Sequence, residues 1–333
     1  MRTSPRIRRE HGAAVVTALL IVTLAVVVVS GLLWRQQVEI RSVENQRLLA
    51  QAAWVERGAL DWARLILRDD QRRTGPVDRL GEPWSVPIAE TRLSDFLGAG
   101  LRTDTAGETS FLSGGIQDAQ ARFNLTNLVV TTLASNGATA ANVDPNALAA
   151  YRRLLQTLGL NPALAEPTAR YIVGTMRTTG SPAPRPLDDA SGLLAIPGYT
   201  PDMVQALEPY VTVLPETTKV NANTAEPEVL SAMFDNFPID RARELVRQRD
   251  QAWFPNVGDV IGRLGTIAKG VNTSTVANVL DVRTHYFLVY GLVRHERASR
   301  MRVSLVYRGE EAGNANTTRV IWTHDTDRLP AFQ

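Results

Sequence analysis

The stretch that decides the fold is AAVVTALLIVTLAVVVVSGLL, residues 13–33, in which 21 residues pass without a charge. As a helix it would be about 31 Å long, which matches the ~30 Å hydrocarbon core of a bilayer. The residues before it include Arg2, Arg6, Arg8 and Arg9. Because basic flanks stay on the cytoplasmic side, we expect a membrane span, with the rest of the chain on the opposite side of the membrane.

Two small residues, Gly12 and Ala13, lie in front of the apolar run and not behind it. An ordinary secretory signal is the competing interpretation, and it would have a shorter apolar run followed by an Ala-x-Ala-like cleavage site. Here the run ends in Trp34-Arg35, and no such pattern follows promptly. A cut between Gly12 and Ala13 would remove the basic leader 1–12 and keep the span.

This arrangement resembles the leader of type IV pilins and pseudopilins, which is short, basic and ends in Gly. The resemblance implies that a prepilin peptidase cuts after Gly12 and methylates the new N-terminus, Ala13. Most members have Glu as the fifth mature residue, whereas this chain has Thr17. The K-type minor pseudopilins of the type II secretion system are the group that lacks this Glu.

Composition limits the classes of function. A length of 333 residues suits two or three domains, and 44% hydrophobic with 21% charged residues is typical of globular proteins. Without Cys there is neither a disulfide framework nor a thiolate metal site. The leader 1–12 holds four Arg and one Glu, a sum of +3, so the formal net charge of +2 leaves −1 for the remaining chain. A generally basic, nucleic-acid-binding surface is therefore not expected.

The rest of the chain divides by periodicity. Apolar residues at three- and four-residue spacings predict one helix from about Ala13 to about Leu67. In the following segment Gly and Pro recur, and residues 116–125 alternate in a hairpin-like pattern. The signals in 127–280 are helical. From Tyr286 onward apolar residues recur at every second position, which predicts antiparallel strands with one buried face.

The fold class predicted from this order is α+β. A long N-terminal helix would pack on an antiparallel sheet built from both strand regions, as in pilins. A large all-α insertion, similar to sterile-alpha-motif or helix-hairpin-helix domains, would interrupt the sheet. The expected parts are the leader 1–12, the membrane part of the helix 13–33, the first pilin-like part 34–126, the inserted helical domain 127–280 and the second pilin-like part 281–333.

Helix starts in the insertion are marked by capping residues. Asp144-Pro145, Asn161-Pro162 and Thr200-Pro201 each place a polar cap before a Pro at the first helical position. We expect Thr224 to cap a fourth helix, Ile239 or Asp240 to open a fifth, and Ser274 to cap a sixth.

Four sequence blocks occur here in the order found in the K-type minor pseudopilins. They are I-x-D-x-Q-x-x-F-N-L at 116–125, P-G-[YF]-T at 197–200, P-Y-V-x-V-L-P at 209–215 and V-N-x-N-T-A at 220–225. With the leader, the resemblance covers nearly the whole chain. It implies a structural subunit, not an enzyme, at the tip of the periplasmic pseudopilus. This subunit would initiate pseudopilus assembly and support export of folded proteins across the outer membrane.

The resemblance also implies partners and location. The partners would be the I-type and J-type minor pseudopilins, the major pseudopilin, the inner-membrane assembly platform and the prepilin peptidase, with no nucleic acid. The protein would cross the inner membrane once, with its C-terminal bulk in the periplasm. Thr17 is expected to suit a subunit with nothing above it, because a Glu there would find no amine to pair.

A membrane-tethered DNA-binding protein of competence type is the main alternative. Residues 193–200 resemble a helix-hairpin-helix element, and 220–225 precedes helices that carry Arg243 and Arg247. Such modules offer backbone N–H groups of a glycine-rich hairpin to phosphate. The second hairpin, 233–238, contains no Gly and ends in a Pro without an N–H, so it is a poor phosphate site.

A periplasmic enzyme with a single membrane span is the third hypothesis. The chain has no Gly-x-Ser-x-Gly elbow, His-Glu-x-x-His pair or Walker loop. His285 and His295 flank a predicted strand, and nothing in the sequence links them to a nucleophile. We therefore expect no catalytic site.

Calcium binding is implied by the resemblance alone. Family members often have an Asp cluster before the P-G-[YF]-T turn, but residues 170–177 hold no carboxylate. Calcium needs six to eight oxygen ligands, usually from several carboxylates. Asp188 and Asp189 lie nearby and equally suit a cap for the helix through Leu193-Leu194. No calcium ligands are assigned, and no other cofactor is expected.

Overall fold

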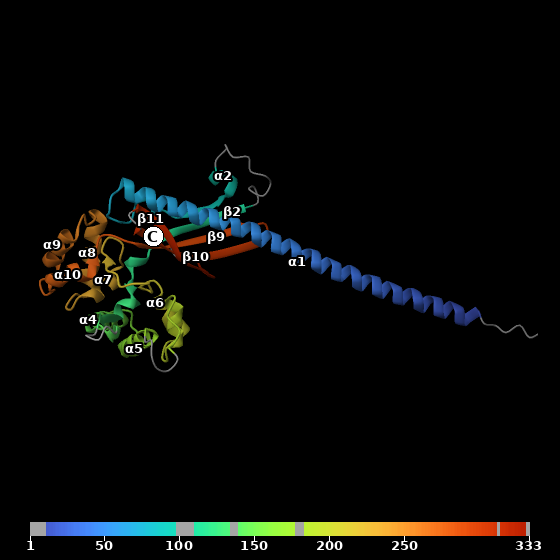
Figure 1. Cartoon of the computed structure of the whole chain (residues 1–333), viewed down its shortest axis with the longest axis horizontal. Helices are drawn as coiled ribbons and strands as arrows, with labels where there is room; N and C mark the ends of the chain where they lie inside the picture. Colours follow the sequence, from blue (N-terminus) through green and yellow to red (C-terminus); the bar gives the residue numbers. More distant parts are fainter. Residues whose placement is uncertain (1–10, 98–109, 134–138, 177–182, 312–313, 331–333) are drawn as a thin grey trace, which may run out of the picture. The chain divides into compact units, whose positions relative to one another are not determined.

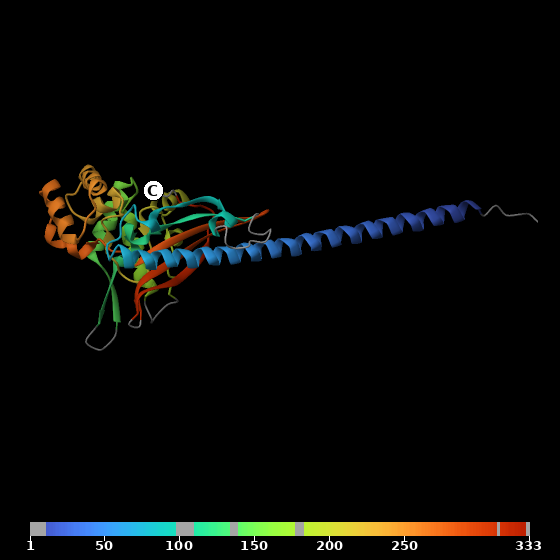
Figure 2. The ribbon, with the colours of Figure 1, turned by 90° about the horizontal axis from the view of Figure 1, so that it is seen from above.

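A single long helix, α1, opens the chain in this computed structural model, which describes residues 11–97, 110–133, 139–176, 183–311 and 314–330 (Figures 1 and 2). It runs continuously from His11 to Arg73 and confirms the one long helix expected. Among the described residues it is the one helix long and apolar enough to cross a membrane; its best window has a mean hydropathy of 2.8 and is not buried. Residues 1–10 of the expected leader lie outside the described residues.

Internal contacts divide the described chain into two units. One takes the described residues within 1–55, 92–111 and 293–300, and the other takes those within 56–91, 112–292 and 301–333. The second unit contains the C-terminal end of α1, most of the sheet residues and the short helices of the insertion.

The two strand regions share one five-stranded antiparallel sheet in the order β1-β2-β9-β10-β11, as predicted. The strands are β1 (Ile88–Arg92), β2 (Ser110–Asp118), β9 (Tyr286–His295), β10 (Ala298–Glu311) and β11 (Asn314–Asp325). A short helix, α2 (Leu93–Leu97), follows β1, and a 3-10 turn, η1 (Pro83–Ser85), precedes it.

The central strand β9 is buried on both faces, whereas one buried face was predicted. Phe287 and Val289 pack with Ala63 and Leu67 of α1 in one apolar cluster. Tyr286, Leu288 and Tyr290 point the other way, into a second cluster. The prediction was wrong because Leu214, from the P-Y-V-x-V-L-P block, covers this second face. The insertion is thus packed against the sheet and is not a separate body tethered to it.

The insertion is a set of short helices (Figure 1). Their buried side chains form one large apolar core. Its helices are α4 (Pro145–Thr157), α5 (Ala165–Thr175), α6 (Pro201–Leu207), α7 (Pro227–Met233), α8 (Ile239–Gln251), α9 (Val257–Ile267) and α10 (Val276–Val279), with 3-10 turns η2 (Ala119–Ala121), η3 (Leu125–Leu128), η4 (Pro162–Leu164), η5 (Ala190–Ala195) and η6 (Thr273–Thr275). Helices this short are held by packing and not by propensity.

Short strand pairs lie within the insertion and at its two ends. The hairpin of β4 (Val129–Leu133) and β5 (Thr139–Val143) is antiparallel, whereas β3 (Phe123–Asn124) pairs with β6 (Val211–Thr212) and β7 (Val220–Asn221) with β8 (Leu280–Asp281) in parallel. The hairpin-like pattern at 116–125 was therefore misinterpreted. Its first half belongs to β2 of the large sheet, and its second half pairs with a strand far along the chain.

Most predicted caps are confirmed. The Asp144 carboxylate accepts from Asn146 N and Ala147 N, Asn161 caps η4, and Thr200 caps α6. Two are wrong. Helix α7 is preceded by Glu226, because the hydroxyl of Thr224 donates elsewhere. The turn near Ser274 is capped by Asn272, which accepts from Ser274 N.

Candidate functional site

The polar residues of two family blocks meet around the buried carboxylate of Asp118, at the end of β2. Its Oδ1 accepts from Gln120 N at 2.7 Å, and its Oδ2 accepts from the Asn221 amide at 2.9 Å. The hydroxyls of Thr224 and Thr284 both donate to Oδ2 at 2.6 Å. Burial raises the pKa of Asp118, and the four donors lower it in part. We name this set the motif junction.

The amide side chains of the blocks extend the motif junction along the backbone. Gln120 donates to Lys219 O at 3.0 Å and accepts from His285 N at 2.7 Å. Asn124 donates to Glu216 O at 2.8 Å and accepts from Leu214 N at 3.1 Å. Gln120 thus bridges the insertion to the residue before β9, and Asn124 fastens β3 to the segment that follows β6, so both side chains join parts of the fold.

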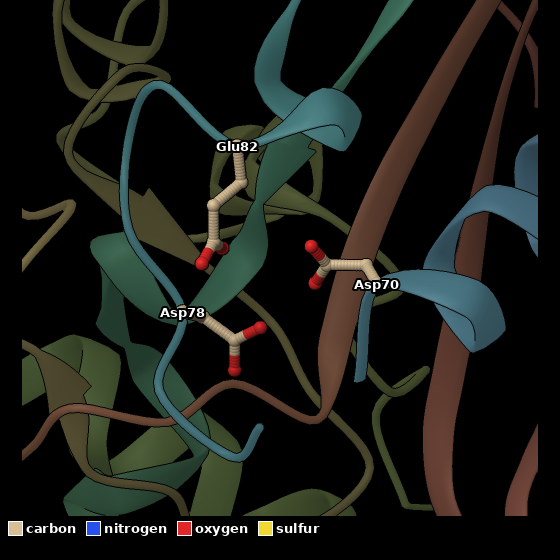
Figure 3. A group of neighbouring side chains, drawn as sticks. All are labelled: Asp70, Asp78 and Glu82. Carbon is tan, nitrogen blue, oxygen red and sulfur yellow. The ribbon is translucent and has the colours of Figure 1, made fainter. Parts of the chain in front are cut away.

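A second polar cluster adjoins the motif junction where α1 ends (Figure 3). The carboxylates of Asp70, Asp78 and Glu82 are buried and point toward one another, with oxygens within 4.8 Å. The guanidinium of Arg308, on β10, donates to Asp70 at 3.2 Å and also to Asp78. The same guanidinium donates to the backbone oxygens of Leu67 and Thr284, both at 3.2 Å.

Burial sets the protonation of this cluster. Desolvation raises the pKa of Asp78 to about 7, against the lowering effect of the Arg308 guanidinium. Desolvation also raises the pKa of Asp70 and of Glu82. The Glu82 carboxylate accepts from Trp84 Nε1 at 2.8 Å.

The cluster does not fit a calcium ion. Arg308 already supplies the positive charge, and backbone or side-chain donors occupy both oxygens of Asp78. Calcium would need six to eight oxygens in place of these donors. The other acidic pair does not fit either, since Asp188 pairs with Arg185 at 3.1 Å and Asp189 accepts from Ser191 N at 2.8 Å, capping η5.

The residues expected to matter for processing lie at the start of α1. Gly12 and Ala13 fall in its first turn. Thr17 lies one turn further, and its hydroxyl donates back to Ala14 O at 3.0 Å. The cut after Gly12 and the methylation of Ala13 stay predictions.

The arginines that suggested DNA binding face acidic partners. Arg243 pairs with Asp240 at 3.3 Å, and Arg247 pairs with Glu244 on the same helix, α8. In the hairpin 233–238, Asp235 pairs with Arg153 at 2.5 Å. In each of these pairs a carboxylate lies beside the arginine charge that a DNA phosphate would need.

The residues that match known protein families include most of these blocks. Two family models, both described as type II secretion system (T2SS), protein K, match residues 121–216 and 220–283. The type II secretion system protein K of Pseudomonas aeruginosa is 30% identical over 328 residues, covering 91% of this chain and 90% of that protein. The chain belongs to the type II secretion system protein K family. Protein K of Pectobacterium carotovorum is 26% identical over 86% of this chain and 89% of that protein.

A solved relative shows the same protein K fold. One chain of the GspK-GspI-GspJ complex from the type 2 secretion system of enterotoxigenic Escherichia coli matches with a TM-score of 0.66 and 21% identity. The match covers 86% of this chain and 99% of that chain. The long helix on a five-stranded sheet and the helical insertion are therefore the protein K architecture.

Sequence reasoning found the block residues but missed the charged cluster that holds them. Asp70, Asp78 and Thr284 lie outside every block. The period-two pattern held no signal for Arg308, because it marks the face of Leu305 and Tyr307 as buried, whereas in the structure Val306 and Arg308 on the other face are buried too. An inward-facing Arg on a strand demands a buried acid, and only the fold shows which one.

Proposed function

We propose that this chain is a minor pseudopilin at the tip of the periplasmic pseudopilus. There it initiates assembly with I-type and J-type minor pseudopilins and supports export of folded proteins across the outer membrane. The observation that carries the proposal is the protein K match over 91% of the chain. The solved relative that shares the fold comes from a complex with GspI and GspJ.

The structure of α1 supports a filament subunit anchored in the inner membrane. Its large apolar side chains from Val15 to Leu33 are exposed, as a bilayer or a bundle of stems requires. The same helix continues until Ala63 and Leu67 are buried against the sheet. A single helix thus serves as membrane anchor and as part of the periplasmic core, with the C-terminal bulk in the periplasm.

Thr17 supports a position at the tip. In a bundle of stems the charged mature N-terminus lies in a low-dielectric environment, where an unpaired ammonium is costly. A Glu at the fifth mature position can pair with the amine of the subunit above. A subunit with nothing above it gains nothing from that Glu, and Thr17 satisfies its own hydroxyl on Ala14 O.

The insertion supports the same position. Residues 127–280, taken as its extent, would collide with a following subunit if the protein were repeated through the shaft, whereas a tip has open space. The remaining parts, 34–126 and 281–333, form the pilin-like body, and the major pseudopilin is among the expected partners. Processing by the prepilin peptidase after Gly12, with methylation of Ala13, precedes assembly through the inner-membrane platform.

The test is co-expression of the tagged full-length chain with the I-type and J-type proteins of its own bacterium. We expect co-purification as one complex in detergent and immunogold label at one end of each pseudopilus. Label spaced regularly along the shaft, or a chain that binds neither partner, would overturn the proposal.

A further inference from the structure

Acidic groups outnumber cations in the buried region where the stem, the sheet and the insertion meet. Asp70, Asp78, Glu82 and Asp118 are 4%, 1%, 2% and 4% exposed. In the part of the chain that the structure describes, the buried guanidinium that contacts them is Arg308, which is 2% exposed. With all four carboxylates ionised, the region would hold uncompensated negative charge away from water, and binding a proton is the least costly relief.

Other charged groups near this region do not balance it. Arg79 lies at the rim, with Nε 3.7 Å from Glu82 Oε1 and its side chain 36% exposed. Arg249 of α8 is buried, but its guanidinium donates to two backbone carbonyls of the V-N-x-N-T-A block. On the β10 side, His285 Nδ1 lies 3.0 Å from the backbone oxygen of Arg308.

Asp78 also carries hydrogen bonds that fasten the insertion to the stem. Its backbone N donates to Val282 O at 2.9 Å, and its backbone O accepts from the Asn221 amide at 3.1 Å. Its carboxylate Oδ2 accepts from Thr284 N at 2.7 Å. A change of charge at Asp78 therefore acts on the segments that join α1 to β7 and to the start of β9.

We propose that Asp70, Asp78, Glu82 and Asp118 form a proton-dependent latch between the stem and the helical insertion. At mildly acidic pH Asp70, Asp78 and Glu82 hold one shared proton beside the charge of Asp118, and the insertion is fixed firmly. Above neutral pH the proton passes to solvent, negative charge is left in the interior, and the junction loosens. The group titrates as a unit, so the proton belongs to no single carboxyl.

Linkage between proton binding and folding fixes the direction in which stability changes with pH. Burial raises the pKa of Asp78 from 3.8 to about 7, and the shifts of the other three carboxyls are in the same direction. Between these two values the folded protein binds more protons than the unfolded chain. The stability contributed by the shared proton is therefore complete below about pH 4 and is lost as the pH rises through about 7.

The experiment is hydrogen–deuterium exchange of the full-length protein in detergent at pH 5.5 and 8.0, after correction for the intrinsic exchange rate. We expect protection of peptides covering 220–225 and 280–285 to fall at least tenfold at the higher pH. A peptide from the middle of α4 serves as the internal reference and should change little. Equal protection at both values would overturn the proposal.

Variants assign the effect to the carboxylates. Asp78→Asn removes one buried charge with little change of shape, and we expect it to abolish the pH dependence at both segments. Glu82→Gln removes the same charge and serves if the first variant does not fold. Asp188→Asn, an exposed acid in the insertion, is the matched control and should behave as the wild type.

The imidazole of His285 contacts the backbone oxygen of Arg308 and is tested in its own arm. His285→Gln should keep the pH dependence, because the latch resides in the carboxylates. If His285→Gln abolishes the dependence, or if both Asp78→Asn and Glu82→Gln retain it, the proposal is wrong.

Discussion

The side-chain amide of Asn221 lies 2.9 Å from the carboxylate of Asp118, and this contact joins two family blocks through residues that are 103 positions apart. The same amide nitrogen lies 3.1 Å from Asp78 O and 3.1 Å from Thr284 Oγ1. One buried side chain thus contacts the loop after α1, the end of β2 and the approach to β9. This explains why polar residues, and not apolar ones, dominate the blocks at this place: they fix orientation between parts as well as holding them together.

Replacing Asp118 by Ala should destabilise the protein by about 3 kcal/mol, because it leaves an amide and two hydroxyls without their buried acceptor. The measurement is the urea midpoint of unfolding of the full-length protein in detergent, followed by tryptophan fluorescence. Asp188→Ala is the control, since Asp188 is exposed and its pair with Arg185 is worth less than about 1 kcal/mol. A loss under about 0.5 kcal/mol for Asp118→Ala would show that the motif junction adds no stability.

Replacing Arg308 by Met should cost about 3–5 kcal/mol, because Asp70 and Asp78 then lose the cation between them while staying buried. The cost should shrink at acidic pH, where a carboxyl can take up a proton instead. Urea unfolding at pH 5.5 and 8.0 measures both effects. The matched change Arg185→Met, at an exposed ion pair, should alter the midpoint little at either pH. Equal costs at the two pH values would contradict this account of the cluster.

Signals from neighbouring residues predicted the helices and strands that depend on neighbouring residues alone. α1 follows from apolar spacing and from the lack of Pro between Ala13 and Arg73, and α4 follows from Asp144-Pro145. Apolar residues at every second position, which are also a local signal, predicted β9, β10 and β11. Thr224 shows where such signals fail, because its hydroxyl could cap a helix or donate to Asp118, and the choice depends on a residue 106 positions away.

Pairings and buried charges could not be derived in this way. Alternation at 116–125 indicates strands but not partners, and Phe123 pairs with Val211 instead of folding back on β2. Asp70 and Asp78 look like ordinary solvated acids in the sequence. In the fold they are buried beside Arg308, which lies 238 and 230 positions further along the chain.

Changing Gly12 to Glu should block processing, because the peptidase is expected to need a small residue before the cut. Intact-mass measurement of the wild type should show a chain beginning at methylated Ala13, and the variant should keep all of leader 1–12. The variant should stay in the membrane but fail to join a filament. Gly58→Glu is the control: it adds the same side chain to the same helix at an exposed position, and it should be processed normally. A wild-type chain that begins beyond Leu33 would rule out the pilin-type leader.

Changing Thr17 to Glu should lower secretion several-fold if the protein caps the filament. The new carboxylate would lie in a low-dielectric bundle with no amine above it, and it would also replace a hydroxyl that now donates to Ala14 O at 3.0 Å. Thr17→Gln is the matched control, since it has the shape of Glu without the charge and should retain most secretion. The readout is the amount of secreted enzyme in the medium of a strain whose own gene for this protein is deleted. If Thr17→Glu raised secretion above the wild type, an amine must be available above residue 17, and the protein would then lie within the shaft and not at its tip.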